Sequence, residues 1–171
     1  GRADILAGIE PRPGKPKMKH PGTFNANPLS AAAGVAVLKR VATGEPTAQA
    51  TANARLLRNR LNAMFASHDW PWVAYGDFST VRVLPGYRGE RPRPDAGDAD
   101  GLIPYGGDLD QLDGPKNAKQ VTALRQAMLL NGVDWWWLGG MTSCEHTAAD
   151  VERTVAAMES AVGSLAAEGL A

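Results

Sequence analysis

The turn HPGTFNANP, residues 20–28, holds the side chains of this sequence that are best suited to bind an anion. Gly22 and Thr23 precede an expected helix start, and such a pair can offer a backbone N–H and a hydroxyl to a phosphate. Asn27 is a favourable N-cap and Pro28 fits the first helical turn, so the helix should begin here. A capped loop that only leads into a packing helix is the alternative, and these residues alone favour it.

The lysine side chains are the candidates for a catalytic amine. A lysine that acts as a nucleophile near neutral pH needs a desolvated or charge-perturbed setting. Lys39 lies on the solvated face of an Ala-rich helix, whereas Lys116 and Lys119 begin a helix after a loop. The remaining candidates, Lys15, Lys17 and Lys19, lie in a Pro/Gly stretch that is expected to be flexible, where nothing would desolvate them. We therefore predict no catalytic residue among them.

The histidine, cysteine and acidic residues of the sequence give little support for a metal site or a catalytic nucleophile. His146 has no second His, Cys or carboxylate cluster at metal spacing, which favours a helix-capping or interface role. Asp98 begins an acidic stretch like part of a calcium loop, but Ala96 and Gly107 occupy the positions where that loop needs acidic ligands. Cys144 lies near no feature that would activate a thiol. The sequence therefore predicts no metal site.

The composition of the chain limits the kinds of binding partner and the compartment that we expect. The chain has 171 residues with 18 Lys plus Arg and 18 Asp plus Glu, so its zero net charge creates no field toward nucleic acid or membranes. The basic stretch 15–20 lacks aromatic residues and suits a solvated loop. A single cysteine favours a reducing compartment, and we expect a cytoplasmic protein. The start, GRADILAG, is typical of the middle of a longer protein.

Hydrophobic periodicity predicts four helices and three strands. The helices are expected at 29–41, 47–67 and 116–131 and from Thr147 onward, and the strands at 72–75, 78–84 and 133–138. In the last strand the consecutive tryptophans, Trp135 to Trp137, would alternate faces and require cover on both sides. The Pro/Gly/Asp-rich loop 85–115 is long enough to be functional or mobile. This order predicts an α+β domain with a small antiparallel or mixed sheet covered by helices.

The segment 20–34 resembles the GTF-x-x-NPL-x-x-AAG stretch of class III pyridoxal-phosphate-dependent aminotransferases, especially the glutamate-1-semialdehyde aminomutase-like branch. Three weaker matches follow the same order along the chain. GRADIL resembles the segment after the family's lysine loop, and Gly-Asp-Phe-Ser at 76–79 resembles its Gly-x-x-Ser strand. The last match is its S-x-x-H-T-x-x-D stretch, carried by Ser143, His146, Thr147 and Asp150.

The resemblance implies a C-terminal fragment of a fold-type I enzyme. Residues 1–26 would end the large domain, and 27–171 would form the C-terminal small domain. Gly22 and Thr23 would bind the phosphate of pyridoxal 5'-phosphate in the partner subunit of a homodimer. The Schiff-base lysine would lie before Gly1, so this fragment alone would be inactive.

Two activities are compatible with the family. One is amino transfer between an amino acid or amine and a keto acid, and the other is the internal shift of an aminomutase acting on a semialdehyde. An alternative of another class is a non-catalytic interaction module that pairs with a complete homologue, since fold does not fix function.

Overall fold

The computed structural model describes residues 2–10, 13–14, 18–19, 21–91 and 103–170. The chain divides into two compact units, 1–40 and 41–171. The predicted basic stretch 15–20 and the Asp98 segment lie largely or wholly outside the described residues.

The first unit contains α1 (Ala3–Leu6) and most of α2 (Pro28–Val41). The Oδ1 atom of Asn27 accepts hydrogen bonds from the backbone N–H of Leu29 and Ser30 at 3.0 and 3.1 Å, which confirms the predicted helix start. No residue of α2 is buried. Its apolar stripe, which includes Leu29 and Val37, is therefore exposed.

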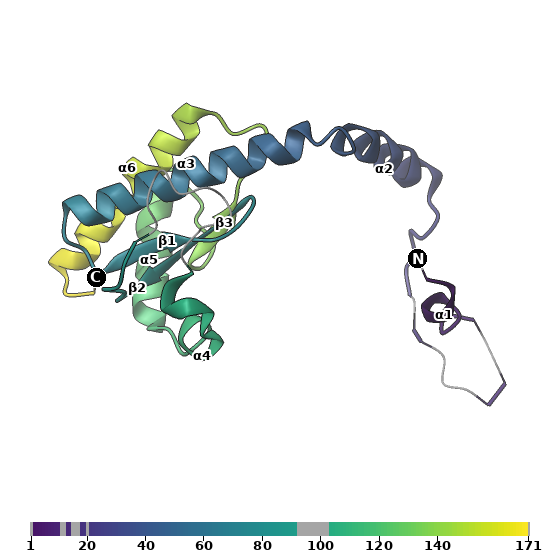
Figure 1. Cartoon of the computed structure of the whole chain (residues 1–171), viewed down its shortest axis with the longest axis horizontal. Helices are drawn as coiled ribbons and strands as arrows, with labels where there is room; N and C mark the ends of the chain where they lie inside the picture. Colours follow the sequence, from purple (N-terminus) through teal and green to yellow (C-terminus); the bar gives the residue numbers. More distant parts are fainter. Residues whose placement is uncertain (1, 11–12, 15–17, 20, 92–102, 171) are drawn as a thin grey trace. The chain divides into compact units, whose positions relative to one another are not determined.

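The second unit is an α+β fold, as predicted (Figure 1). Its elements are α3 (Glu45–Ser67), β1 (Trp72–Tyr75), β2 (Thr80–Pro85), η2 (Pro104–Gly107), α4 (Leu109–Leu112), α5 (Ala118–Leu130), β3 (Gly139–Met141) and α6 (Ala148–Ala167). The three strands form one antiparallel sheet in the order β1-β2-β3. In the described part of loop 85–115, η2 and α4 replace irregular chain.

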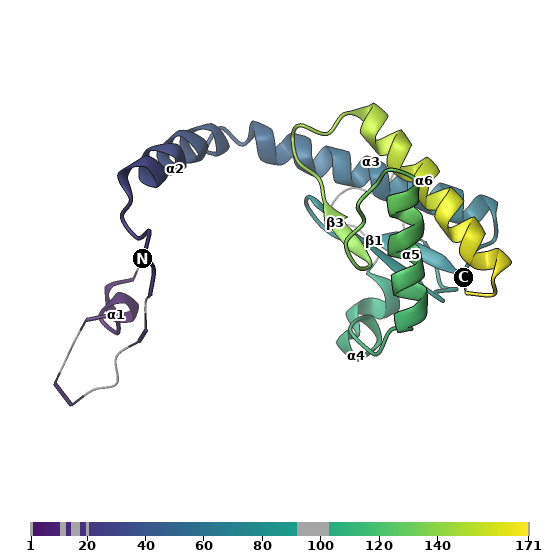
Figure 2. The same cartoon turned by 180° about the vertical axis from the view of Figure 1, so that it is seen from behind.

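Side chains alternate along each strand, so the two faces of the sheet carry different residues and pack against different elements. One face packs against α3, α5 and α6 (Figure 2). This core contains Leu61, Phe65, Trp72, Ala74, Val81, Val83, Leu124, Met128, Met158 and Val162. The opposite face carries a smaller cluster of Val73, Leu84 and Tyr87.

Capping residues fix the later helix starts. The side chain of Asn117 accepts from the backbone N–H of Lys119 and Gln120, so α5 begins two residues later than predicted. Thr147 and Asp150 form a reciprocal capping box, which confirms the predicted start of α6.

The predicted strand 133–138 is wrong. Trp136 forms an isolated bridge with Gly139, and the N–H of Gly139 donates to the C=O of Trp136 at 3.1 Å, so the chain turns here. Trp137 lies inside this turn with φ of 53°, a left-handed conformation that no strand residue adopts. Strand β3 begins only at Gly139. Trp135 is buried, but Trp136 and Trp137 are 68% and 54% exposed, so the expected two-sided cover is also wrong.

The second predicted strand, 78–84, starts too early. Gly76 has φ of 137° and Phe78 has φ of 46°, so residues 76–79 form the connection between β1 and β2. A Cβ atom on Gly76 would lie 2.6 Å from the carbonyl oxygen of Thr80, which explains the glycine. Strand β2 begins at Thr80.

Candidate functional site

The turn that contains Gly22 and Thr23 is closed by its own backbone. The N–H of Asn25 donates to the C=O of Gly22 at 3.2 Å, and the N–H of Asn27 donates to the C=O of Phe24 at 3.1 Å. A Cβ atom on Gly22 would lie 2.2 Å from Oδ1 of Asn25. Glycine at this position therefore lets the Asn25 side chain fold back over the turn.

Unused hydrogen-bond donors gather in this turn. Thr23 is exposed, and neither its hydroxyl nor its N–H forms a hydrogen bond with another described residue. The N–H of Phe24 is equally unused among the described residues. These donors precede the N-terminus of α2, the positive end of the helix dipole. The turn therefore presents exposed hydrogen-bond donors, the chemistry that an anion requires.

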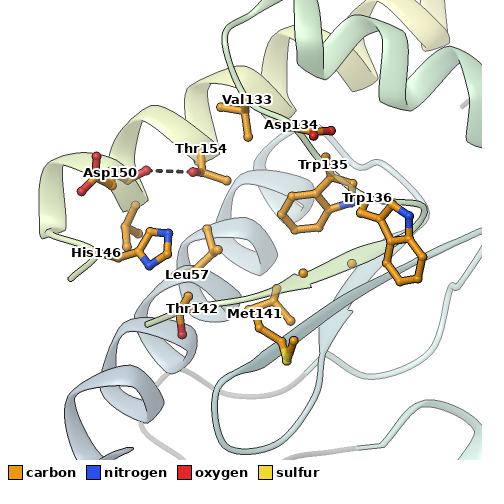
Figure 3. A pocket seen from close by; sticks show the side chains of 14 residues that line it. Leu57, Val133, Asp134, Trp135, Trp136, Met141, Thr142, His146, Asp150 and Thr154 are labelled. Carbon is orange, nitrogen blue, oxygen red and sulfur yellow. Dashed lines mark hydrogen bonds between the residues drawn. The ribbon is translucent and has the colours of Figure 1, made fainter. Parts of the chain in front are cut away.

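A separate small cavity of about 210 Å³ lies in the second unit, between β3, residues 133–136 and the start of α6. Figure 3 shows His146 on one side of this cavity and Trp135 and Trp136 on the other, with Leu57 between His146 and Trp135. Its walls are mostly apolar, and His146 is the one imidazole among the described residues that line it.

The contacts of His146 indicate a structural role. Its Nδ1 atom accepts from the N–H of Ser143 at 2.9 Å and lies 3.0 Å from the Ser143 hydroxyl oxygen. Because Nδ1 is an acceptor, the neutral ring carries its proton on Nε2. The Nδ2 atom of Asn53 donates to the carbonyl oxygens of Ser143 and His146 at 3.0 and 2.8 Å. These bonds anchor the turn before α6 on α3. No group of three His, Cys, Asp or Glu side chains within the described residues could hold a metal ion.

The carboxylate of Asp150 completes this turn. It accepts from the N–H and the hydroxyl of Thr147 at 2.9 and 2.8 Å. These hydrogen bonds, the backbone one first, hold the pKa of Asp150 below its usual value. The carboxylate therefore acts as a cap and has no perturbation typical of a general acid.

The described lysines are poorly placed to act as amines. Lys19, Lys39 and Lys119 are exposed. Lys116 is half-buried, and its Nζ atom donates to the C=O of Gln111 at 3.1 Å. None of the lysines in the described ranges is buried, and burial is what lowers a lysine pKa toward neutrality.

Two buried asparagines on α3 were not predicted from the sequence. Asn53 and Asn62 are only 6% and 4% exposed. Each satisfies backbone groups of a distant segment. A polar residue within an apolar helical stripe was the available signal.

No family model matches this chain. The beta-phenylalanine transaminase of Variovorax paradoxus is 42% identical over 67 residues, which are 39% of this chain and 15% of that protein. The chain resembles transaminases in sequence and in fold. An omega-transaminase from Sphaerobacter thermophilus matches 95% of the chain at 22% identity with a TM-score of 0.67.

Two further solved structures agree. The beta-phenylalanine aminotransferase from Variovorax paradoxus matches 98% of the chain at 26% identity with a TM-score of 0.63. A transaminase with PLP bound matches the whole chain at 24% identity with a TM-score of 0.66. The chain spans 34–35% of the length of these three transaminase structures. No helix among the described residues has the length and apolarity to cross a membrane.

Proposed function

We propose that this chain is part of a class III aminotransferase that uses pyridoxal 5'-phosphate. The observation that carries the proposal is the match of 95–100% of the chain to three transaminase structures, one of them with PLP bound. A sequence identity of 42% over 67 residues to a transaminase also supports the proposal. The GTFNANPL motif, which resembles the class III aminotransferases, points to the same family.

In this proposal Gly22 and Thr23 hold the cofactor phosphate of the partner subunit in a homodimer. The unused N–H and hydroxyl donors of Thr23 support this role, since a phosphate offers acceptors to such donors. When bound, PLP supplies an electron sink for amino-group chemistry. This chain's own part is to bind and orient one end of the cofactor.

The lysine that attaches the cofactor is proposed to lie on a part of the enzyme outside this chain. The exposed positions of Lys19, Lys39 and Lys119 support this assignment. The chain alone should therefore be inactive.

Amino transfer between an amino donor and a keto acid is the favoured reaction, because the similar proteins are named as transaminases. An aryl β-amino acid is the donor that the Variovorax relative's name suggests. The aminomutase reaction of the glutamate-1-semialdehyde branch is the weaker choice. The single Cys144 supports a cytoplasmic location.

A non-catalytic module that pairs with a complete homologue is a second candidate. The apolar side chains of α2 favour it, because Leu29 and Leu38 are 80% and 68% exposed. A chain that serves only for pairing needs no competent phosphate turn.

A chimera tests the proposed function. The matching third of the Variovorax paradoxus enzyme is replaced by this chain, and PLP affinity and amino transfer are measured. We expect both to be retained. Thr23→Ala should weaken PLP binding by roughly tenfold to a hundredfold, since it removes a hydrogen bond to a charged group.

Ser160→Ala is the matched control, because it removes an exposed hydroxyl on α6 and should leave PLP affinity unchanged. A folded, dimeric chimera without PLP binding would favour the pairing module. Equal PLP affinity in the Thr23→Ala and parent chimeras would refute the phosphate role.

A further inference from the structure

A second, larger pocket lies between β2, the α4–α5 connection, the start of α5 and the turn 136–138. Its volume is about 780 Å³, within the range of small-molecule sites. Polar and charged side chains on its wall include Tyr75, Arg82, Asp113 and Lys116. Trp136 and Trp137 supply aromatic surface. The described wall carries two cations, Arg82 and Lys116, and one carboxylate, Asp113, so it has an excess of positive charge.

Arg82 is held at this pocket by the sheet itself. It pairs with Tyr75 across β1 and β2, which places both side chains on the same face. A Cβ atom on Gly139 would lie 2.7 Å from Cδ of Arg82, so the arginine stem passes directly over the glycine of β3. Arg82 is exposed, and its guanidinium forms no hydrogen bond or ion pair with another described residue. Its donors are therefore open to a ligand.

Tyr75 contributes a second donor. Burial raises the pKa of its hydroxyl, with opposing effects from Arg82 and Asp113. The hydroxyl therefore stays protonated at neutral pH, and it accompanies the guanidinium as a neutral hydrogen-bond donor.

Trp137 is held in a costly conformation beside this pocket. A bulky L-residue at φ of 53° is strained, and the 54% exposed indole recovers little by burial in the core. Glycine or asparagine would form the same turn more easily. Strain of this kind is often kept where a side chain serves a ligand.

We propose that this pocket binds a small carboxylate that carries an aromatic ring, with the carboxylate at Arg82 and the ring against Trp136 and Trp137. A planar guanidinium suits a carboxylate, and indole faces suit an aromatic ring. Every residue of the described wall belongs to this chain. Ligand binding at this pocket can therefore be tested separately from the phosphate turn and from amino transfer.

The probe is 3-phenylpropanoate, titrated into the chain of residues 1–171 while amide and indole N–H signals are followed by NMR. We expect saturable binding with Kd of about 1 mM or tighter. Propanoate, without the ring, and 3-phenylpropylamine, with the opposite charge, should each bind at least about tenfold more weakly.

Two variants test the wall. Arg82→Gln should weaken binding about tenfold or more. Trp137→Gly should do the same while keeping or raising thermal stability, because glycine relieves the left-handed φ. Phe78→Gly is the matched control: Phe78 is also an exposed aromatic residue at positive φ, but it lies on a different pocket. Arg125→Gln is the charge control.

Binding that is lost in Arg82→Gln and Trp137→Gly but kept in both controls supports the site. Three results would overturn it: no saturable binding by the parent chain, equal binding of the amine probe, or affinities in the two wall variants that match the controls.

Discussion

The side chain of Asn62 in α3 forms two hydrogen bonds of 2.8 Å with the backbone of Ala74 in β1, donating to its C=O and accepting from its N–H. Strand β1 lies at an edge of the sheet, where backbone groups lack a strand partner. Arg91 adds hydrogen bonds to the C=O of Trp70 and Trp72 at 2.6 and 3.2 Å. The edge is thereby closed to a strand from another molecule.

Replacing Asn62 with alanine should destabilise the chain by about 2–4 kcal/mol, because it leaves two buried backbone groups unsatisfied. Urea unfolding of the parent and variant chains measures the difference. Asn131→Ala is the control: Asn131 also donates to a backbone carbonyl, that of Ala127, but at the exposed end of α5. Its loss should stay below about 1 kcal/mol. Similar losses in both variants would contradict the edge-closing role.

A neighbouring pair of glycines in β3 offers a second test. A Cβ atom on Gly139 would lie 2.6 Å from the carbonyl oxygen of Val81, whereas one on Gly140 would have no described atom beyond its chain neighbours within 4 Å. Gly139→Ala should therefore cost about 1–3 kcal/mol in unfolding free energy, typical of overpacking. Gly140→Ala should change stability by less than about 1 kcal/mol. Equal losses of unfolding free energy at the two positions would mean that β3 moves to make room for the added methyl group, and would contradict the close packing of Gly139 against Val81.

The capping carboxylate of Asp150 should make stability depend on pH. Its pKa is lowered in the folded chain by hydrogen bonds from Thr147, so the ionised form stabilises the fold above the unfolded value. That contribution is lost as the pH falls through the folded pKa. Asp150→Asn should therefore lower stability at pH 7, and the gap should close as the pH falls below about 4.

Thermal unfolding at several pH values measures this gap. Glu145→Gln removes a nearby exposed carboxylate outside the capping box and should show no comparable change. A gap for Asp150→Asn that is as large at about pH 3 as at pH 7 would refute the electrostatic part of the cap.

Local signals predicted much of the fold. The Asn27–Pro28 pair and the Thr147–Asp150 pair marked helix starts that the structure confirms, because capping depends on residues within one turn. The α+β class followed from the order of the elements. The phosphate turn came from the family resemblance, since Gly22 and Thr23 alone did not favour a site.

The rest depends on long-range pairing. Three consecutive tryptophans have strong strand propensity, yet Trp137 takes a left-handed turn without the glycine or asparagine that would signal it. Arg82 is placed at its pocket because β2 and β3 pair in a register that brings Gly139 under the arginine stem. No spacing along the sequence predicts that register.

The proposed trans role of Thr23 has its own test in mixed dimers of the chimera. One subunit lacks the cofactor-binding lysine, and the other carries Thr23→Ala. If Thr23 serves the partner's site, the lysine-bearing site receives an intact threonine from its partner, and PLP affinity there is normal. If Thr23 serves its own site, the lysine-bearing site lacks it, and PLP binds roughly tenfold to a hundredfold more weakly. Weak binding in the purified mixed dimer would refute the crossing while leaving the phosphate role intact.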